Sequence, residues 1–295
     1  MLSYYSVADL VERAEKAGKK ISDIAISDQA PILGMTEEDL VKTMEAMFDV
    51  MVEGTHEGTE QDLRSNSGLT GGEGQKVMQY AQKNGGGFCG PFFTKALARG
   101  LAVSNCNAAM GKIVATPTAG SCGILPGCLV TMYEDGGVDK NTIVRSIFTA
   151  GALGMVIAEN ASIAGAEGGC QAECGSASAM AAGALTEIMG GSPKACGDAC
   201  GMAIVNQLGL VCDPVAGLVE IPCVKRNASG VAVALTAATM ALAGVTLYIP
   251  VDQCIEAMKR IGDSLPSGLK ETAQGGLAIT EMGKKLKRQV FGDKN

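Results

Sequence analysis

Three of the eleven cysteines lie in segments rich in glycine or proline, where loops can converge. Cys170 ends GAEGGC, and Cys212 and Cys223 flank CDPVAGLVEIPC. Thiolates from converging loops are the usual ligands of iron–sulfur clusters, and a helix predicted directly after Cys170 favours its thiolate form. A free cysteine is also a common small hydrophobe of protein cores. Spacing alone leaves both interpretations open and slightly favours simple burial.

The other cysteines fit packing better than ligation. Cys106, Cys128 and Cys254 lie in helical or apolar stretches, while Cys196 and Cys200 are one helical turn apart. No compact C-x-x-C pair occurs, so neither a zinc ribbon nor a ferredoxin-like site is predicted. If only three thiolates hold a cluster, one iron lacks a protein ligand and can act as a Lewis acid, whereas a fully ligated cluster transfers electrons.

The composition indicates a chain with much interior, or with a surface that another chain covers. Of its 295 residues 47% are hydrophobic and only 19% are charged, and tryptophan is absent. The net charge of −7 argues against nucleic acid as a partner. The basic run from Lys284 to Arg288 fits the last turn of a helix. No signal peptide is recognisable, so we expect a cytoplasmic protein with reduced thiols.

The elements that must position the cysteines are helices. Thr36 and Ser192, the latter followed by Pro193, are predicted N-caps. No convincing strand and no internal repeat is found, which predicts a mainly α, single helical catalytic domain (1–295) with glycine-rich active-site loops and an N-terminal helical segment (1–60) packed on it. Apolar spacing and breaker residues predict helices over 7–20, 36–51, 91–110, 141–158, 171–189, 192–208 and 250–264, with glycine-rich or proline-containing segments at 65–74, 84–90, 116–127, 165–170 and 212–223.

Residues 227–251 carry no charge and are long enough to span a bilayer. Their apolar content is mostly Ala, Val, Gly and Thr, and Lys225, Arg226 and Asp252 border them directly. We therefore interpret the segment as a buried helix of a soluble core and expect no membrane association.

Five unusual strings make the chain similar to a known family. They occur in the family's order and are GLTGG (68–72), ATPTAGS (115–121), NASIAGAEGGCQAE (160–173), LGLVCDPVAGLVEIPCVKRNA (208–228) and KETAQGGLA (270–278). The chain resembles the alpha chain of the two-chain, iron–sulfur-dependent L-serine dehydratases over essentially its full length. The resemblance implies a 4Fe-4S cluster held by Cys170 of GCQ, Cys212 of CDPV and Cys223 of IPC.

The resemblance also bears on the fourth iron. Some single-chain relatives end in a cysteine that reaches the cluster, whereas this chain ends in VFGDKN, so we expect an iron open to substrate or water. Cys122 and Cys174 are additional thiols. Because Cys174 lies one helical turn beyond Cys170, a different choice of ligand stays open.

The implied reaction converts L-serine to pyruvate and ammonia without pyridoxal phosphate, with the open iron as Lewis acid. The rival interpretations are a related lyase acting on L-cysteine or L-threonine, and an electron-transfer protein. Glycine-rich loops can form backbone nests for a carboxylate, although they are also ordinary turns. The candidate substrate-binding residues are Ser67, Thr70, Gly71, Gly72, Thr118, Gly120, Ser121 and Lys270.

The general base is not found in these motifs. His56, the only histidine, lies in a polar stretch outside them and is expected to be solvent-exposed. Asn160 and Glu167 are expected to orient the loop before Cys170. In the family, a motif containing serine and histidine belongs to the beta chain. We therefore expect a beta-chain partner that supplies the base, an oligomeric enzyme, and little activity in the isolated chain.

Overall fold

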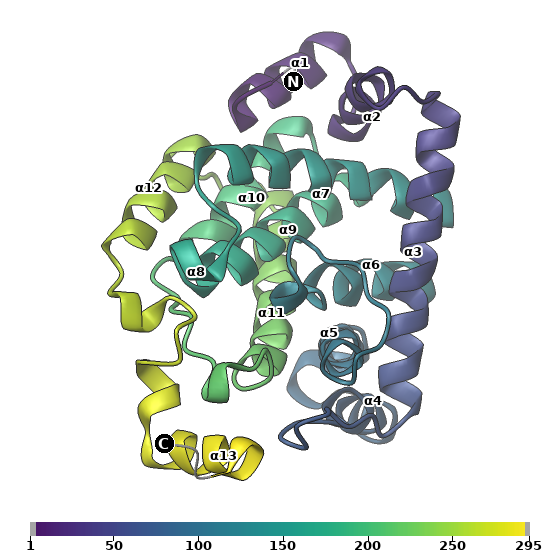
Figure 1. The fold of residues 1–295 in the computed structure, drawn as a ribbon. Helices are drawn as coiled ribbons and strands as arrows, with labels where there is room; N and C mark the ends of the chain where they lie inside the picture. The colour runs from purple at the N-terminus through teal and green to yellow at the C-terminus, as the bar shows by residue number, and fades with distance from the viewer. Residues whose placement is uncertain (1–3, 293–295) are drawn as a thin grey trace.

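The computed structural model describes residues 4–292 and is built almost entirely of helices (Figure 1). Within that range there is no β-strand, only two isolated bridges, Arg64–Gly71 and Cys212–Lys270. The predicted mainly α fold is confirmed. The helices are α1 (Val7–Ala17), α2 (Ile21–Ile32), α3 (Glu37–Glu60), α4 (Glu73–Asn84), η1 (Gly87–Cys89), α5 (Gly90–Ala108), η2 (Ala119–Ser121), α6 (Ile124–Glu134), α7 (Lys140–Asn160), α8 (Gly165–Gly168), η3 (Gln171–Gly175), α9 (Ser176–Ile188), α10 (Pro193–Val205), η4 (Val215–Gly217), α11 (Cys223–Leu242), α12 (Val251–Ser264), η5 (Ser267–Leu269), η6 (Gly276–Ile279) and α13 (Glu281–Phe291).

The core is organised around α9, which contacts α6, α7, α10 and α11 (Figure 1). Its residues from Ser176 to Glu187 are all buried, which is typical of a helix enclosed on every side. Alanine and glycine make up much of this helix, and their small side chains let the neighbouring helices approach closely. The turn that follows Cys170 and leads into α9 is therefore anchored to a helix that is enclosed on every side.

The three N-terminal helices pack against different parts of this core. Helix α1 contacts α10 and α12, α2 contacts α7, and α3 lies along one side against α5, α6 and α7 (Figure 1). The carboxylate of Asp252, at the start of α12, accepts hydrogen bonds from the backbone N–H groups of Val7 (2.8 Å) and Ala8 (3.0 Å). The start of α1 is thereby tied to the start of α12.

Both predicted N-caps are confirmed. The Thr36 hydroxyl accepts a hydrogen bond from Asp39 N, and the Ser192 hydroxyl accepts one from Ala195 N. Helix α3 continues nine residues beyond the predicted end at 51, to Glu60. Helix α2 was not predicted, because its serine and aspartate residues and the internal Pro31 are typical of a connection.

Two predicted loops contain helical structure. Helix α6 begins at Ile124 inside the predicted 116–127 loop, since Pro126 lies in its first turn and removes no intrahelical hydrogen bond there. The predicted 165–170 loop contains the short α8, and the helix predicted from 171 begins with a π-helical turn, η3.

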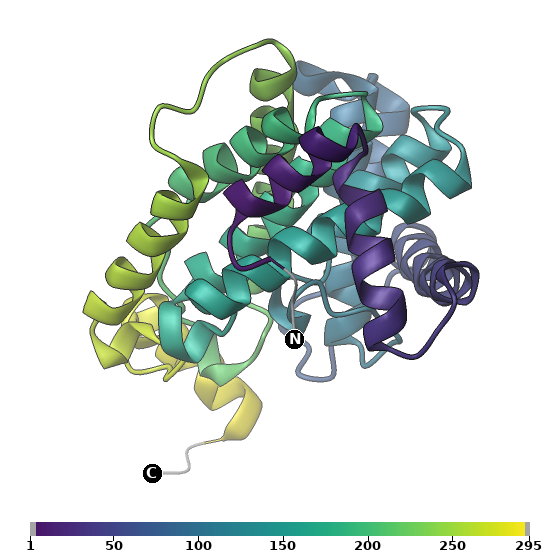
Figure 2. The same ribbon diagram turned by 90° about the horizontal axis from the view of Figure 1, so that it is seen from above.

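The uncharged segment 227–251 does not form one helix. Helix α11 starts earlier, at Cys223, and ends at Leu242, and the following residues form an exposed loop before α12 that stands out in Figure 2. Among the described residues the helix that is long and apolar enough to cross a membrane is α7 instead, and 67% of its most apolar window is buried inside the protein. That burial is typical of a core helix.

The last three residues of the VFGDKN tail lie outside the described range. The expectation that the tail provides no ligand therefore stays a prediction.

Candidate active site

Cys170 follows Gly169, a glycine at which three segments of the chain come into contact. Gly169 has a left-handed backbone (φ +76°), and a Cβ atom there would lie 2.7 Å from Leu265 Cδ1 and 2.9 Å from the Leu210 carbonyl oxygen. Only glycine fits this close approach without strain. Cys170 then leads into the π-turn η3, a feature that is frequent at functional sites.

Gln171 holds this turn against its neighbours with three hydrogen bonds. Its backbone N–H donates to the Leu210 carbonyl (2.9 Å), its side-chain oxygen accepts from Gly209 N (2.9 Å), and its Nε2 donates to the Met258 carbonyl (2.8 Å). The hydrogen bonds to residues 209 and 210 place the segment that leads to Cys212 beside the turn that begins at Cys170.

The segment around Cys212 is fixed from two sides. Its backbone N–H donates to the Leu269 carbonyl (2.9 Å), and its carbonyl accepts from Glu271 N (2.8 Å), so the KETAQGG string runs beside it. Arg226, one turn after Cys223 on α11, donates to the Val211 carbonyl (2.7 Å) and to Asp213 Oδ1 (2.8 Å). Arg226 thereby ties the segment around Cys212 to the first turn of α11, which Cys223 opens.

The three thiols are buried, with exposed fractions of 2%, 3% and 8% for Cys170, Cys212 and Cys223. Burial is the main reason that the pKa of Cys212 and of Cys223 is raised, that of Cys223 to about 12, and a negative charge on Cys170 contributes to both shifts. The pKa of Cys170 is lowered, first by a hydrogen bond from Cys174 and then by the positive charge of Arg226. The Cys170 and Cys174 sulfurs are 3.4 Å apart, and the pKa of Cys174 is raised well above its usual value, chiefly by this hydrogen bond.

Among residues 4–292 no group of three or more His, Cys, Asp or Glu side chains lies close enough together to hold a single metal ion. A four-iron cluster is larger than an ion and takes soft thiolate ligands that are further apart. The donor set of three buried sulfurs from separate segments, with an arginine beside them, fits such a cluster better than it fits zinc.

Glu173 connects the TPTAGS loop to the segment around Cys212. The Thr118 hydroxyl donates to Glu173 Oε1 (2.7 Å) and lies 3.3 Å from the Ser121 hydroxyl. Glu173 Oε2 is 4.0 Å from the Cys212 sulfur. Burial is the main reason that the pKa of Glu173 is raised, and the nearby Glu271 adds to it. Thr118, Gly120 and Ser121 are therefore brought to the cysteine-bearing loops.

The GLTGG loop is tied to the segment before Cys223 by Glu220. This buried carboxylate accepts hydrogen bonds from the hydroxyls of Ser67 (2.7 Å) and Thr70 (2.8 Å). Gly71 N donates to Glu73 Oε2 (2.8 Å), and Gly72, with a left-handed backbone, caps the start of α4. The hydroxyls of Ser67 and Thr70, which were predicted to bind substrate, thus both donate to a carboxylate of the protein itself.

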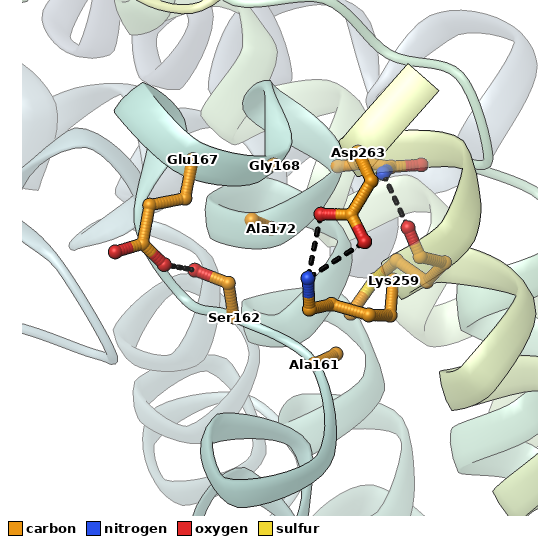
Figure 3. Close-up of a pocket in the computed structure, with 9 residues that line it drawn as sticks. Ala161, Ser162, Glu167, Gly168, Ala172, Lys259 and Asp263 are labelled. Atoms are coloured by element: carbon orange, nitrogen blue, oxygen red, sulfur yellow. Dashed lines mark hydrogen bonds and ion pairs between the residues drawn. The ribbon is translucent and has the colours of Figure 1, made fainter. Parts of the chain in front are cut away.

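Lys270 pairs its backbone with Cys212, but its ammonium group makes no ion pair within residues 4–292. Asn160 lies away from the cysteines and donates to the Tyr5 and Val156 carbonyls. Glu167 is exposed and accepts a hydrogen bond from Ser162 (Figure 3). The cavity that Ser162, Glu167 and Asp263 help to line has a volume of about 20 Å³. This is enough for a single water molecule and too small for a substrate.

His56 is about half exposed, as predicted. Its Nε2 lies 2.5 Å from Glu134 Oε1, which belongs to an ion-pair network with Arg99 at the end of α6. This network joins α3, α5 and α6 and does not include the cysteine-bearing loops.

Sequence reasoning did not single out Glu173, Glu220, Arg226 or Asn227. Glu173 carried a recognisable signal, because it is the only charged residue between Gly168 and Thr186. A lone charge in a segment of small residues that enters the core needs a partner or a function. The other three lie in the string 208–228 that carries the family resemblance, but only the fold reveals their contacts.

A family model described as "Serine dehydratase alpha chain" matches residues 5–278. The chain belongs to this family. A protein named "Probable L-serine dehydratase, alpha chain" from Bacillus subtilis is 46% identical over 289 residues, which cover 98% of this chain and 96% of that protein. The L-serine dehydratase alpha chain of Peptoniphilus asaccharolyticus is 43% identical, with 96% and 97% covered.

Some relatives of the serine dehydratase alpha-chain family are longer. The L-serine dehydratase of Mycobacterium bovis is 37% identical over 285 residues, which cover 94% of this chain and 61% of that protein. The chain therefore matches the whole of proteins named as alpha chains and only part of a protein named simply as the dehydratase.

Proposed function

We propose that this chain converts L-serine to pyruvate and ammonia in the cytoplasm as part of a two-chain L-serine dehydratase. The observation that carries the proposal is the convergence of three buried cysteines, from the GCQ, CDPV and IPC strings, in a member of the serine dehydratase alpha-chain family. Relatives that match over nearly their whole length are named L-serine dehydratase alpha chains. Turnover of L-threonine and L-cysteine under the same conditions measures how selective the enzyme is.

Cys170, Cys212 and Cys223 would hold a 4Fe-4S cluster in this proposal. When bound, such a cluster supplies a Lewis-acidic iron that makes the substrate hydroxyl a better leaving group. The thiols must lose their protons to bind iron, and Arg226 provides a positive charge beside Cys170 that favours the deprotonated form.

The loops of this chain bind and orient the substrate. Thr118, Ser121 and the backbone at Gly120 lie together beside Glu173. Ser121 and the backbone at Gly120 are proposed to hold the serine carboxylate, with Lys270 as its cationic partner, and Thr118 joins them only if its hydroxyl leaves Glu173. Ser67, Thr70, Gly71 and Gly72 belong to the same proposal only if the bonds from the two hydroxyls to Glu220 open when substrate binds.

The base that removes the α-proton is proposed to come from a beta-chain partner. His56, the only histidine of the chain, hydrogen-bonds to Glu134 on another part of the molecule. The beta chain would thus complete the active site, and the functional enzyme would be an oligomer of both chains.

Iron and acid-labile sulfide, measured anaerobically on the purified protein, test the cluster. Replacement of Cys170, Cys212 or Cys223 by serine should each remove most of both, because a hard hydroxyl is a poor ligand for this cluster. Cys254→Ser is the matched control, since Cys254 is equally buried but packs on α12 and donates to the Ile249 carbonyl. Retention of a full complement of iron in any of the three ligand variants would exclude that residue from the ligand set.

A further inference from the structure

Glu173 occupies the point where three loops of the candidate site meet. Its carboxylate accepts the Thr118 hydroxyl on one oxygen, and its other oxygen is 4.0 Å from the Cys212 sulfur. Glycines leave room for it on two sides. A Cβ atom at Gly120 would lie 2.9 Å from Oε1, and one at Gly165 would lie 2.7 Å from Oε2.

The Glu173 carboxylate forms no ion pair with the part of the chain that the structure describes. Within residues 4–292 the Thr118 hydroxyl is its only normal-length hydrogen-bond donor. Arg226, whose charge acts on Glu173, directs its guanidinium to the Val211 carbonyl and Asp213 instead. A partly buried carboxylate is costly unless a cation or several donors compensate it.

The substrate of the proposed reaction carries such a cation. L-Serine presents one ammonium, one carboxylate and one hydroxyl, and Ser121 with the backbone at Gly120 is proposed to take the carboxylate, while the Thr118 hydroxyl donates to Glu173. We propose that Glu173 binds the α-ammonium group of the substrate, with Thr118 holding the carboxylate of Glu173 in position. The inference rests on the proposed function and adds the residue that distinguishes an amino acid from a hydroxy acid.

This arrangement gives the negative charge of Glu173 a role that substitutions at position 173 can test. Glutamine at position 173 would keep the size and could still accept the Thr118 hydrogen bond, but it would carry no charge to attract an ammonium group. Aspartate would keep the charge and shorten its reach. The two variants therefore separate the charge of Glu173 from the space that it fills.

The test measures ligand binding to the cluster-loaded complex of this chain with its beta chain by calorimetry. L-Alanine carries the ammonium and carboxylate groups and has no hydroxyl to eliminate. 3-Hydroxypropanoate keeps the hydroxyl and carboxylate of serine and lacks the ammonium. In Glu173→Gln we expect L-alanine to bind about tenfold more weakly or worse and 3-hydroxypropanoate to bind as in wild type. Glu173→Asp should recover part of the loss.

Iron and sulfide content and the thermal midpoint are measured for every variant, and Glu159→Gln, an exposed carboxylate near the end of α7, is the matched control. Equal weakening of both ligands, weakening of neither, or loss of iron from Glu173→Gln would overturn the inference and leave a structural role. If the wild-type complex neither binds nor turns over L-serine, the proposed function fails together with it. If wild type turns over L-serine while Glu173→Gln keeps its affinity for L-alanine, only the role of Glu173 is wrong.

Discussion

At the scale of single residues, Asn227 shows how a buried amide joins two loops of the site. It is 1% exposed, and its Oδ1 accepts a hydrogen bond from Gly123 N (2.8 Å). Its Nδ2 donates to the carbonyls of Gly120 (2.8 Å) and Cys223 (3.0 Å). One side chain thus links the TPTAGS loop to the residue that opens α11.

Replacement of Asn227 by alanine should lower the free energy of unfolding by about 3 kcal/mol, because it leaves buried backbone groups without partners. The effect is measured by chemical denaturation of the protein without cluster. Asn206→Ala removes an exposed amide that bonds only to the Met202 carbonyl one turn earlier, and it should cost about 0.5 kcal/mol or less. A loss at Asn227 no larger than that at Asn206 would show that the loop does not depend on this amide.

The sequence indicated which cysteines to consider but did not predict the side chains that contact the site. Cys170, Cys212 and Cys223 could be chosen because each borders a loop and stands in a distinctive string. The contact between Cys174 and Cys170 was foreseen only as a shared helical turn, and the π-turn brings the two sulfurs to 3.4 Å. Glu220 and Asn227 bind partners between 104 and 153 residues away, a separation over which local patterns carry no information.

At the scale of elements, backbone strain collects in the two segments that flank Cys212. Ala216, Glu271 and Ala273 all have positive φ angles, which side chains other than glycine rarely adopt. Such conformations persist only where surrounding contacts impose them, and they concentrate at functional sites. The hydrogen bond from Glu271 N to the Cys212 carbonyl is one such contact, and it holds the backbone of Glu271 beside Cys212.

The ends of α5 and α6 are joined by ion pairs that make stability depend on pH. Arg99 is 5% exposed and donates to Asp135 Oδ2 (2.6 Å), and Lys95 pairs with the other oxygen. Burial alone would raise the pKa of Asp135, but the hydrogen bonds from Lys95 and Arg99 outweigh it and hold the pKa below the usual aspartate value. A lowered pKa in the folded state stabilises the protein above the unfolded pKa and loses that effect as pH falls through the folded value.

Asp135→Asn should therefore lower the free energy of unfolding by about 2 kcal/mol at neutral pH. The difference from wild type should shrink as the pH falls below about 4, where Asp135 takes up a proton in the unfolded chain before it does so in the folded protein. Denaturation curves at a series of pH values measure both. Asp263→Asn breaks an exposed pair with Lys259 one turn apart and should change stability by about 0.5 kcal/mol or less at every pH. A difference at Asp135 that does not change with pH would point to packing rather than charge.

Helices were predictable where caps and an apolar stripe agreed, as at Thr36 and Ser192. The prediction failed where neither signal was present. Helix α2 begins at Ile21, and the side chain of its N-cap residue, Lys20, makes no capping hydrogen bond. The helix buries both serine and isoleucine side chains, and it packs against α7. The end of α11 at Leu242 was missed because the apolar composition continues beyond it, into residues that the structure places on the surface.

At the scale of the whole molecule, the candidate site is one connected network drawn from distant parts of the chain. Glu220 binds the GLTGG loop, Asn227 binds the TPTAGS loop, Gln171 binds the segment before Cys212, and Cys212 binds the KETAQGG segment. These segments span residues 67 to 277, and the buried helix α9 lies behind the turn that carries Cys170. Binding a cluster at the centre of this network should stabilise all of it, because the ligands come from separate segments.

Within residues 4–292 the network contains thiols, hydroxyls, carboxylates, Lys270 and one arginine, and none of these groups is suited to remove an α-proton near neutral pH without a large change of pKa. Histidine is the usual choice for that task, and His56 is engaged with Glu134 elsewhere. Relatives that carry the additional length, such as the dehydratase of Mycobacterium bovis, match this chain over only 61% of their own sequence. The remaining length is where a base would be expected in those proteins, and for this chain it would belong to a second polypeptide.

Mixing this chain with its beta chain tests whether the base comes from the second polypeptide. The cluster-loaded chain alone should form pyruvate from L-serine at least about a hundredfold more slowly than the same chain mixed with its beta chain, since general base catalysis contributes factors of this size. Iron and sulfide content should be the same in both samples, so the difference cannot come from loss of the cluster. His56→Gln in the complex should keep the wild-type rate, because His56 pairs with Glu134 outside the site. Full turnover by the chain alone, abolished by His56→Gln, would instead place the base within this chain.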